Sequence, residues 1–239
     1  MKKVLGGIVF FTAVFLFSFI NSFPMENIVN NVLSKEGKRA GVVVDYDTGT
    51  FSLTKVELEN VTIIKQGSVL TKLDKVTANI GIGKVNLECE KEKGILKAEV
   101  ESDKAKLDFK DFYIVTEGTK YFKQIAITGD MVVQTKKKIS TGKLRVNLKE
   151  AVQMPMPVSD MVAIIDLKTN QDGIDIDVVD LQGTDIRGNG KINIENNRKD
   201  FNSSKINGSL KVRAITGQVT VDVSGTIGNI QVNLKPEMK

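Results

Sequence analysis

The stretch Leu53-Thr54-Lys55-Val56-Glu57-Leu58-Glu59-Asn60-Val61-Thr62-Ile63 decides the fold class of this chain. Val56 and Leu58 alternate with charged neighbours, and Val61 and Ile63 continue the alternation. A period of two residues places successive side chains on opposite faces of a β-strand. One dry face and one wet face are typical of antiparallel sheets. The stretch therefore predicts a half-buried strand.

The same alternation recurs over most of the chain beyond Arg39. It is found in residues 85–89, 144–148, 174–178, 192–194, 210–212, 219–223 and 230–234. Gly-containing turn signals separate these segments, namely Asp47-Thr48-Gly49, Lys93-Gly94, Glu117-Gly118, Asp172-Gly173, Asn207-Gly208 and Gly228-Asn229. We therefore predict a mainly β fold over residues 40–239, with a dozen or more mostly antiparallel strands of about 5–6 residues in a curved sheet with a dry interior.

One segment, residues 151–158, interrupts this rhythm and carries Pro155 and Pro157. Proline cannot donate a hydrogen bond to a sheet ladder, so the segment is interpreted as a linker or crossover. Ser159-Asp160 would then cap a short helix through Ile165, or the same residues would form a strand. A boundary near 151–160 leaves two alternatives open, one long sheet or two packed halves.

The N-terminal run Val4–Met25 has no charged residue and follows Lys2 and Lys3. About 20 apolar residues cross a bilayer as a helix, and positive charge stays in the cytoplasm. Residues 1–24 are predicted to be an uncleaved, single-pass membrane anchor, with a cleaved signal peptide as the alternative. Residues 25–39 predict an amphipathic helix, with regular helix to about Lys35 and an end marked by Gly37, lying on the membrane surface or on the first strands.

Composition excludes several function classes. The 239 residues contain no His and no Trp, and Cys89 is the only cysteine. A His-based catalytic triad and the usual zinc ligand sets are therefore excluded, and Cys89 is interpreted as a buried small hydrophobe. The net charge of +5 is spread along the chain, unlike a clustered nucleic-acid footprint. We expect no enzyme, no catalytic, cofactor or metal-binding residues, and no nucleic-acid partner.

Four short motifs are candidate sites. Asp175 and Asp177 share one strand face and could bind calcium, but a solvated strand face is favoured. Lys136-Lys137-Lys138 is interpreted as a solvated hairpin end rather than a lipid contact. Gly81-Ile82-Gly83-Lys84 lacks the full phosphate-loop pattern and is predicted to be a turn, as is Arg187-Gly188-Asn189-Gly190.

The N-terminal part of the chain resembles the opening of the type II secretion system protein N (GspN) family. The resemblance lies in Phe23-Pro24 after the apolar run, the helix that follows, a strand at residues 41–45 and the 53–63 stretch. The C-terminal half of that family is resembled by five short segments, namely residues 181–183, 188–194, 204–210, 224–227 and 230–234. Residues 91–141 match the family poorly. The resemblance implies a non-enzymatic inner-membrane accessory of secretion with a periplasmic β-rich domain akin to AsmA-like envelope proteins. It carries over no catalytic residues.

The sequence supports two functional expectations. The first is a subunit anchored in the bacterial inner membrane, N-terminus in the cytoplasm and bulk in the periplasm, that docks secretion or envelope proteins. The second is lipid binding or transfer, because many amphipathic strands in one curved sheet would form an apolar groove for acyl chains.

Overall fold

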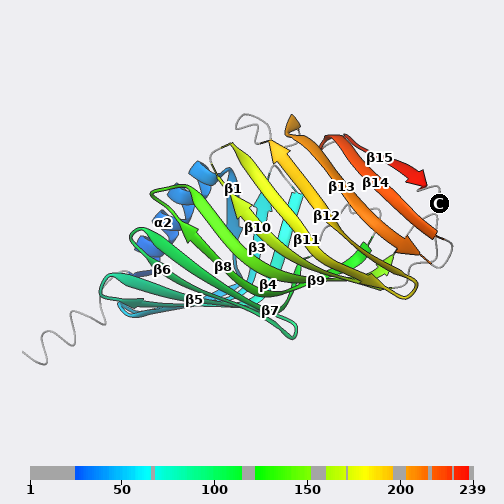
Figure 1. Cartoon of the computed structure of the whole chain (residues 1–239). Helices are drawn as coiled ribbons and strands as arrows, with labels where there is room; N and C mark the ends of the chain where they lie inside the picture. Colours follow the sequence, from blue (N-terminus) through cyan, green and yellow to red (C-terminus); the bar gives the residue numbers. More distant parts are fainter. Residues whose placement is uncertain are drawn as a thin grey trace, which may run out of the picture.

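The computed structural model describes residues 25–65, 68–114, 122–151, 160–170, 172–195, 203–214, 217–227 and 229–236. Within them, one helix is followed by a single antiparallel sheet of fifteen strands (Figure 1). The predicted membrane anchor lies outside the described residues. Among the residues that are described, no helix combines the length and apolarity needed to cross a membrane.

The strands follow one another in space almost in chain order. The elements are α2 (Met25–Ala40), β1 (Val42–Asp45), β2 (Thr48–Phe51), β3 (Lys55–Lys65), β4 (Ser68–Gly81), β5 (Lys84–Lys91), β6 (Gly94–Glu101), β7 (Lys104–Ile114), β8 (Phe122–Gln134), β9 (Ile139–Ala151), β10 (Met161–Thr169), β11 (Gly173–Gly183), β12 (Ile186–Glu195), β13 (Lys205–Ala214), β14 (Gly217–Thr226) and β15 (Asn229–Pro236). From β3 to β15 each strand pairs with the next, and β3 also pairs with β1 and β2. Every pairing is antiparallel, so the mainly β prediction is confirmed.

The sheet is not divided at the prolines. β9 and β10 pair directly, with Leu148 opposite Met161 and Leu144 opposite Ile165. Residues 152–159 therefore connect neighbouring strands of one sheet, and the two-halves alternative is wrong. The helix predicted through Ile165 is also wrong, because Ala163, Ile165 and Leu167 continue the alternation as part of β10.

The sheet bends toward one face at its N-terminal end. Phe112 of β7 belongs to the same buried cluster as Val56, Leu58 and Val61 of β3. Three strands lie between β3 and β7, so a flat sheet would hold them roughly 19 Å apart. The shared cluster therefore requires strong curvature, as Figure 1 shows.

The helix α2 covers this curved end. Val29 and Leu33 pack against the β3–β7 cluster, and the Tyr46 hydroxyl donates a hydrogen bond of 2.7 Å to the Asn30 side chain. Two further apolar residues of this amphipathic helix, Ile28 and Val32, are exposed.

The helix continues to Ala40, past the predicted end at Gly37. Gly37 is buried, and a Cβ there would lie 2.7 Å from the Val42 carbonyl oxygen, so this glycine serves a close approach. Gly41, with φ of +68°, is the glycine that ends the helix.

Candidate functional site

The most distinctive feature of the molecule is an apolar face that crosses the whole sheet. The strand register lines up side chains of the same parity into continuous cross-strand rows. The first apolar row contains Val56, Ala78, Leu87, Ala98, Leu107, Met131, Gly142, Leu167, Ile176, Ile192, Gly208, Val223 and Val232. Each strand from β3 to β15 contributes one residue, and none of the thirteen is polar.

A second apolar row runs beside the first, two residues further along each strand. It contains Leu58, Val76, Cys89, Leu96, Phe109, Gly129, Leu144, Ile165, Val178, Gly190, Leu210, Val221 and Leu234. Cys89 was interpreted as a buried small hydrophobe; it lies on the apolar side of β5 and is partly buried. Burial raises the pKa of its thiol, with a smaller contribution from Glu88, so the group is a poor nucleophile. We call these two rows together the apolar face.

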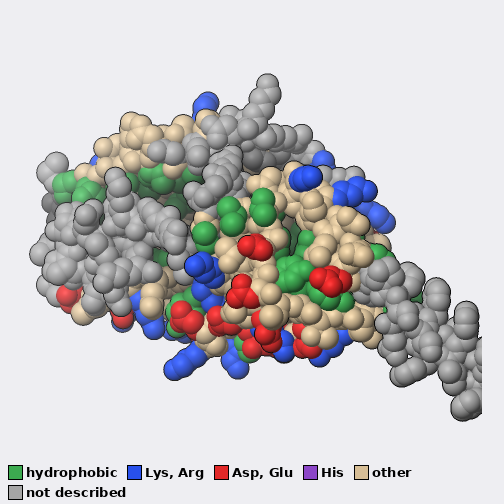
Figure 2. Space-filling view, turned by 180° about the vertical axis from the view of Figure 1, so that it is seen from behind, with side chains coloured by type: hydrophobic (Ala, Val, Ile, Leu, Met, Phe, Trp, Pro, Cys, Tyr) green, Lys and Arg blue, Asp and Glu red, His purple; other side chains and the backbone are tan. Residues whose placement is uncertain are grey.

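Exposure along the apolar face changes from one end to the other. At β3, Val56 and Leu58 are 6% and 5% exposed, and they lie under α2 in the buried cluster. Across the middle, most members are partly exposed, and Leu144 and Val178 are buried. At β15, Val232 and Leu234 are 56% and 59% exposed. In the space-filling view, hydrophobic side chains gather in the hollow of the molecule, with Asp and Glu side chains near its border (Figure 2).

Apart from the sheet strands, α2 is the one element among the described residues. It contacts β1 and β2 and packs on the β3–β7 cluster at the closed end. In the part of the chain that the structure describes, the central and C-terminal parts of the apolar face therefore have no second layer. Such a face lacks the partner layer that two-layer domains use to bury apolar strands.

Glycines within the rows let the strands approach closely. A Cβ on Gly190 would lie 2.2 Å from the Ser209 carbonyl oxygen, and a Cβ on Gly208 would lie 2.6 Å from the Lys191 carbonyl oxygen. Both were predicted to mark turns, and both predictions are wrong, because the residues lie inside β12 and β13. The turn between β11 and β12 is instead at Thr184-Asp185.

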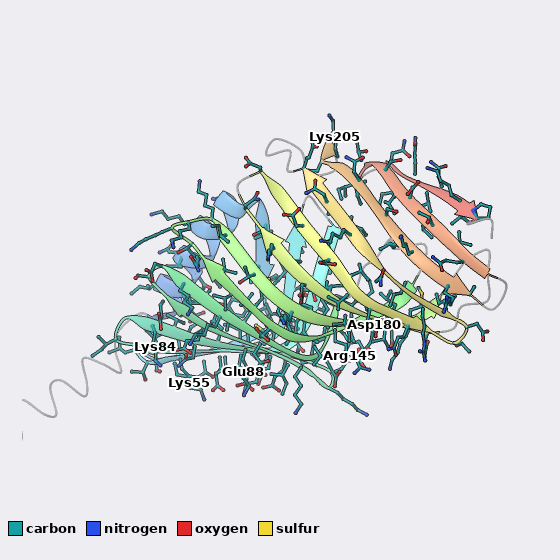
Figure 3. The ribbon with its side chains drawn as sticks, viewed as in Figure 1. Lys55, Lys84, Glu88, Arg145, Asp180 and Lys205 are labelled. Carbon is teal, nitrogen blue, oxygen red and sulfur yellow. The ribbon has the colours of Figure 1, made fainter. Side chains whose placement is uncertain are left out.

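The opposite face is polar. The register there aligns Glu57, Thr77, Glu88, Lys97, Asp108, Asp130, Lys143, Asp166, Asp177, Lys191, Ser209, Asp222 and Asn233. Ion pairs stabilise it: Lys75 Nζ lies 2.9 Å from Glu57 Oε1, and Lys235 Nζ lies 2.7 Å from Asp222 Oδ2. Figure 3 labels six charged residues that belong to this polar face.

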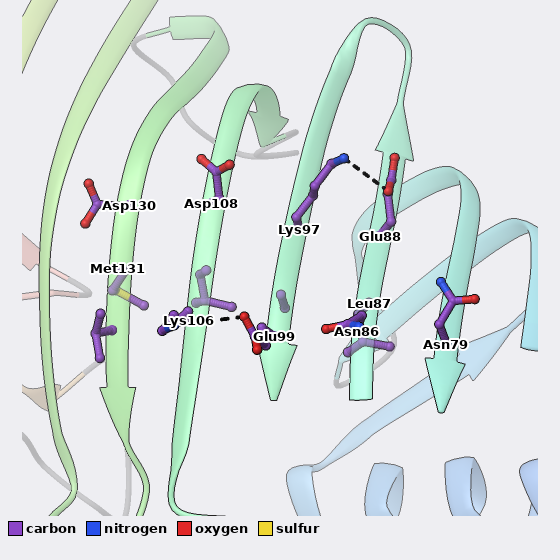
Figure 4. A pocket seen from close by; sticks show the side chains of 13 residues that line it. Asn79, Asn86, Leu87, Glu88, Lys97, Glu99, Lys106, Asp108, Asp130 and Met131 are labelled. Atoms are coloured by element: carbon purple, nitrogen blue, oxygen red, sulfur yellow. Dashed lines mark ion pairs between the residues drawn. The ribbon is translucent and has the colours of Figure 1, made fainter. Parts of the chain in front are cut away.

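A depression of about 450 Å³ is found on the polar face between β4 and β8. Figure 4 shows its lining, where Lys97 pairs with Glu88 at 3.4 Å and Lys106 pairs with Glu99 at 3.9 Å. Charges of both signs already face each other there. The lining holds the carboxylates of Glu88, Glu99, Asp108 and Asp130 against the ammonium groups of Lys97 and Lys106, so two carboxylates are in excess. The depression is therefore a solvated gap between side chains of the polar face.

The candidate motifs from the sequence lie on this solvated surface. Asp177 Oδ2 lies 3.5 Å from Lys191 Nζ, and Asp175 accepts a hydrogen bond of 2.7 Å from the Asn193 side chain. The wet-face interpretation is confirmed. Lys136 to Lys138 lie in the exposed turn between β8 and β9, and Gly83 lies in the turn between β4 and β5, both as predicted. Within the described residues, no group of three or more His, Cys, Asp or Glu side chains could hold a metal ion.

Lys91 is a charged residue on the apolar side of β5, and its position was not recognised in the sequence. It follows Leu87 and Cys89 at the same parity, is 5% exposed, and donates a hydrogen bond of 3.3 Å to the Thr71 hydroxyl. Burial lowers the pKa of its ammonium group, and the carboxylates of Glu92 and Asp74 partly oppose this. The sequence signal for this buried position is a lysine that stands where the alternation of the strand calls for an apolar residue.

The alternating segments found in the sequence do not include the apolar positions of β4, β6, β7, β8 and β10, which complete the rows. Leu107 with Phe109, Met131 with Val133 and Ile165 with Leu167 carry the same alternation and could have been found from it. Comparisons with family models, curated proteins and solved structures gave no match. The site is therefore defined by its physical character alone, which is that of an extended, partly exposed apolar surface.

Proposed function

We propose that this protein binds the hydrocarbon chains of membrane lipids along its apolar face and catalyses no reaction. The observation that supports this proposal is the pair of uninterrupted apolar rows across thirteen strands, partly exposed in the middle and mostly exposed at β15. Soluble surfaces rarely carry continuous apolar patches beyond roughly a few hundred Å², and larger ones mark binding sites.

The dimensions suit long flexible ligands. Thirteen strands at a spacing of about 4.8 Å give a path of roughly 60 Å along the curve. Each CH₂ group removed from water contributes about 0.8 kcal/mol. A surface without directed polar groups gains this energy from any acyl chain, so chain chemistry rather than headgroup identity would drive binding.

We further propose that the protein works in the bacterial inner membrane, with its N-terminus in the cytoplasm and its sheet in the periplasm, as an accessory of a type II secretion system. This rests on the apolar run at residues 4–25 and on the resemblance to the protein N family. Exposure of Ile28 and Val32 on α2, directly after that run, supports a position close to the bilayer. Recovery of secretion proteins with the chain from solubilised membranes is the expected result, and their absence would contradict the secretion role while leaving lipid binding untouched.

Photo-cross-linking in native membranes tests lipid binding directly. A benzophenone side chain is placed at apolar-face positions Leu107, Leu167 and Val223 of the full-length chain, and at their polar-face neighbours Asp108, Asp166 and Asp222. The two residues of each pair are neighbours in the same strand, and their side chains point to opposite faces of the sheet. Mass spectrometry after illumination should find phospholipid adducts at the three apolar positions and not at their neighbours.

Two results would contradict the proposal. Equal adduct yields on both faces would indicate general contact with the bilayer. Absence of adducts at the apolar positions would show that something other than lipid covers the face.

A further inference from the structure

The strand β15 presents an open edge. It pairs with β14 on one side, from Asn229 opposite Thr226 to Pro236 opposite Val219. Every residue of β15 is exposed, including Ile230, Val232 and Leu234 at 50%, 56% and 59%. Among the described residues no strand pairs with its outer edge.

This edge lacks the usual protection against strand addition. Natural edge strands are shortened, bulged, or supplied with charges and prolines. β15 has eight residues in regular register, and its one charge, Lys235, and its one proline, Pro236, both lie at the same end. Lys235 is moreover engaged by Asp222 at 2.7 Å. At the other end of the sheet, β1 has only four residues and lies against α2.

We propose that β15 pairs with β15 of a second copy of this chain, in antiparallel register about a two-fold axis through Val232. Residue numbers in each pair then sum to 464. Val232 faces Val232 of the second copy, Ile230 faces its Leu234, and Gln231 faces its Asn233. The remaining pair joins Asn229 to Lys235 of the second copy.

The register is self-complementary in each respect that matters for an edge. Apolar residues face apolar residues on one side of the joined sheet, polar residues face polar residues on the other, and no like charges meet. Pro236 falls beyond the paired residues, so its missing N–H costs nothing. The two-fold axis stands perpendicular to the sheet, so the apolar face of one copy continues into that of the other.

The evidence for this contact is the edge itself, and it does not depend on lipid binding. A strand from a different protein could use the same hydrogen-bonding groups. We favour a second copy because β15 can pair with an identical strand without placing like charges opposite each other.

Disulfide cross-linking of the full-length chain in membranes tests the register. In a Cys89→Ala background, Val232→Cys places two Cα atoms about 4.5–5.5 Å apart across the axis, within disulfide range. Gln231→Cys is the matched control, because two copies of residue 231 lie about 8 Å apart in this register, which is beyond that range. Val232→Cys should give a dimer under oxidation, and Gln231→Cys should not.

Co-expression supplies the reciprocal result. Gln231→Cys in one tagged chain and Asn233→Cys in another should cross-link to each other. The proposal is overturned if Val232→Cys gives no dimer, if Gln231→Cys dimerises equally well, or if Val232→Cys links to a different protein instead.

A charge substitution tests the same contact without cysteine. Val232→Lys places two ammonium groups at the axis and should lower the dimer fraction of the detergent-solubilised chain more than about tenfold at fixed concentration. Val43→Lys on β1, where the side chain is 62% exposed, is the control and should leave the dimer intact. An unchanged dimer with Val232→Lys would contradict the proposal.

Discussion

The two ends of the apolar face are built from the same residue types, but one end is covered and the other is exposed to solvent. The second apolar row begins with Leu58 of β3 and ends with Leu234 of β15, and these leucines are 5% and 59% exposed. At β3, curvature brings Phe112 onto the row and α2 covers it. At β15, nothing among the described residues does so. Alternation therefore defines which face is apolar, and the covering elements decide where that face contributes to stability and where it remains available for binding.

The sharpest way to break this comparison is to truncate both leucines. Leu58→Ala should lower the free energy of unfolding by about 2–5 kcal/mol, because it opens a cavity in a packed cluster. Leu234→Ala should change it by less than about 0.5 kcal/mol. Thermal unfolding of the solubilised full-length chain, followed by circular dichroism, measures both. Equal losses would mean that the two ends are covered alike.

The close approach of strands in the middle of the face is tested at Gly190. Gly190→Ala places a methyl group 2.2 Å from the Ser209 carbonyl oxygen and 2.7 Å from Leu210 Cα, so β12 and β13 must separate. A loss of about 1–3 kcal/mol in unfolding free energy is expected. Gly81→Ala is the matched control, since its nearest atom lies 3.5 Å away, and its stability should stay close to that of the unsubstituted chain.

The closed end contains the buried Lys91, whose lowered pKa makes stability depend on alkaline pH. Below its folded-state pKa the ammonium is charged in both states and folding bears the full desolvation cost. As pH rises from that value to the ordinary value of 10.5, the unfolded chain holds more protons and stability rises. Lys91→Met should therefore be more stable than the unsubstituted chain at pH 8, and the difference should shrink toward pH 10.5. Melting temperatures of both proteins across this range check the sign; a difference that grows with pH would contradict it.

The smallest effect is expected at the open end, where Lys235 and then Ser209 lower the pKa of Asp222. The ion pair is solvent-exposed and worth little. Its stabilisation is complete above the unfolded-state pKa of the carboxyl group and disappears as pH falls through the lowered folded-state value. Asp222→Asn should cause a small fall in melting temperature at pH 7 that vanishes in acid and in high salt. A loss that persists at low pH would rule out the charge as its cause.

The sequence was sufficient to predict the mainly β class, the antiparallel pairing and the apolar side of many strands, because a period of two is a local property. It also located the turns that contain Gly83 and Lys93 and the solvated positions of Asp175 and Asp177. Strand lengths were underestimated: β4 has 14 residues and β8 has 13. The thirteen strands from β3 to β15 have eight or more residues each. Their length depends on hydrogen bonds to neighbouring strands, which no single segment of sequence reveals.

The glycines account for most of the remaining errors. Gly188, Gly190 and Gly208 were interpreted as turn residues, yet they lie in strands where a neighbouring backbone occupies the position of a Cβ. Gly37 was interpreted as a helix end for the same reason. A glycine that serves conformational freedom and a glycine that serves close approach are identical in sequence. Only the pairing of strands, which brings Lys211, Ser209 and Lys191 beside these residues, separates the two roles.

The continuity of the apolar rows likewise depends on register. Gly142 faces Met131 and Leu167 across two pairings, and a shift of one residue would have placed charged side chains in the row. The alternation within each strand can be found in the sequence. The alignment of thirteen strands into continuous rows is seen only in the sheet.

The most direct measurement for the central claim is the lipid-adduct yield from a photo-cross-linker at Val223 compared with the same probe at Asp222. These neighbours lie on opposite faces of β14, which is far from the covered end. The account predicts a phospholipid adduct at Val223 and essentially none at Asp222. Equal yields at both positions, or an adduct at Asp222 alone, would contradict it.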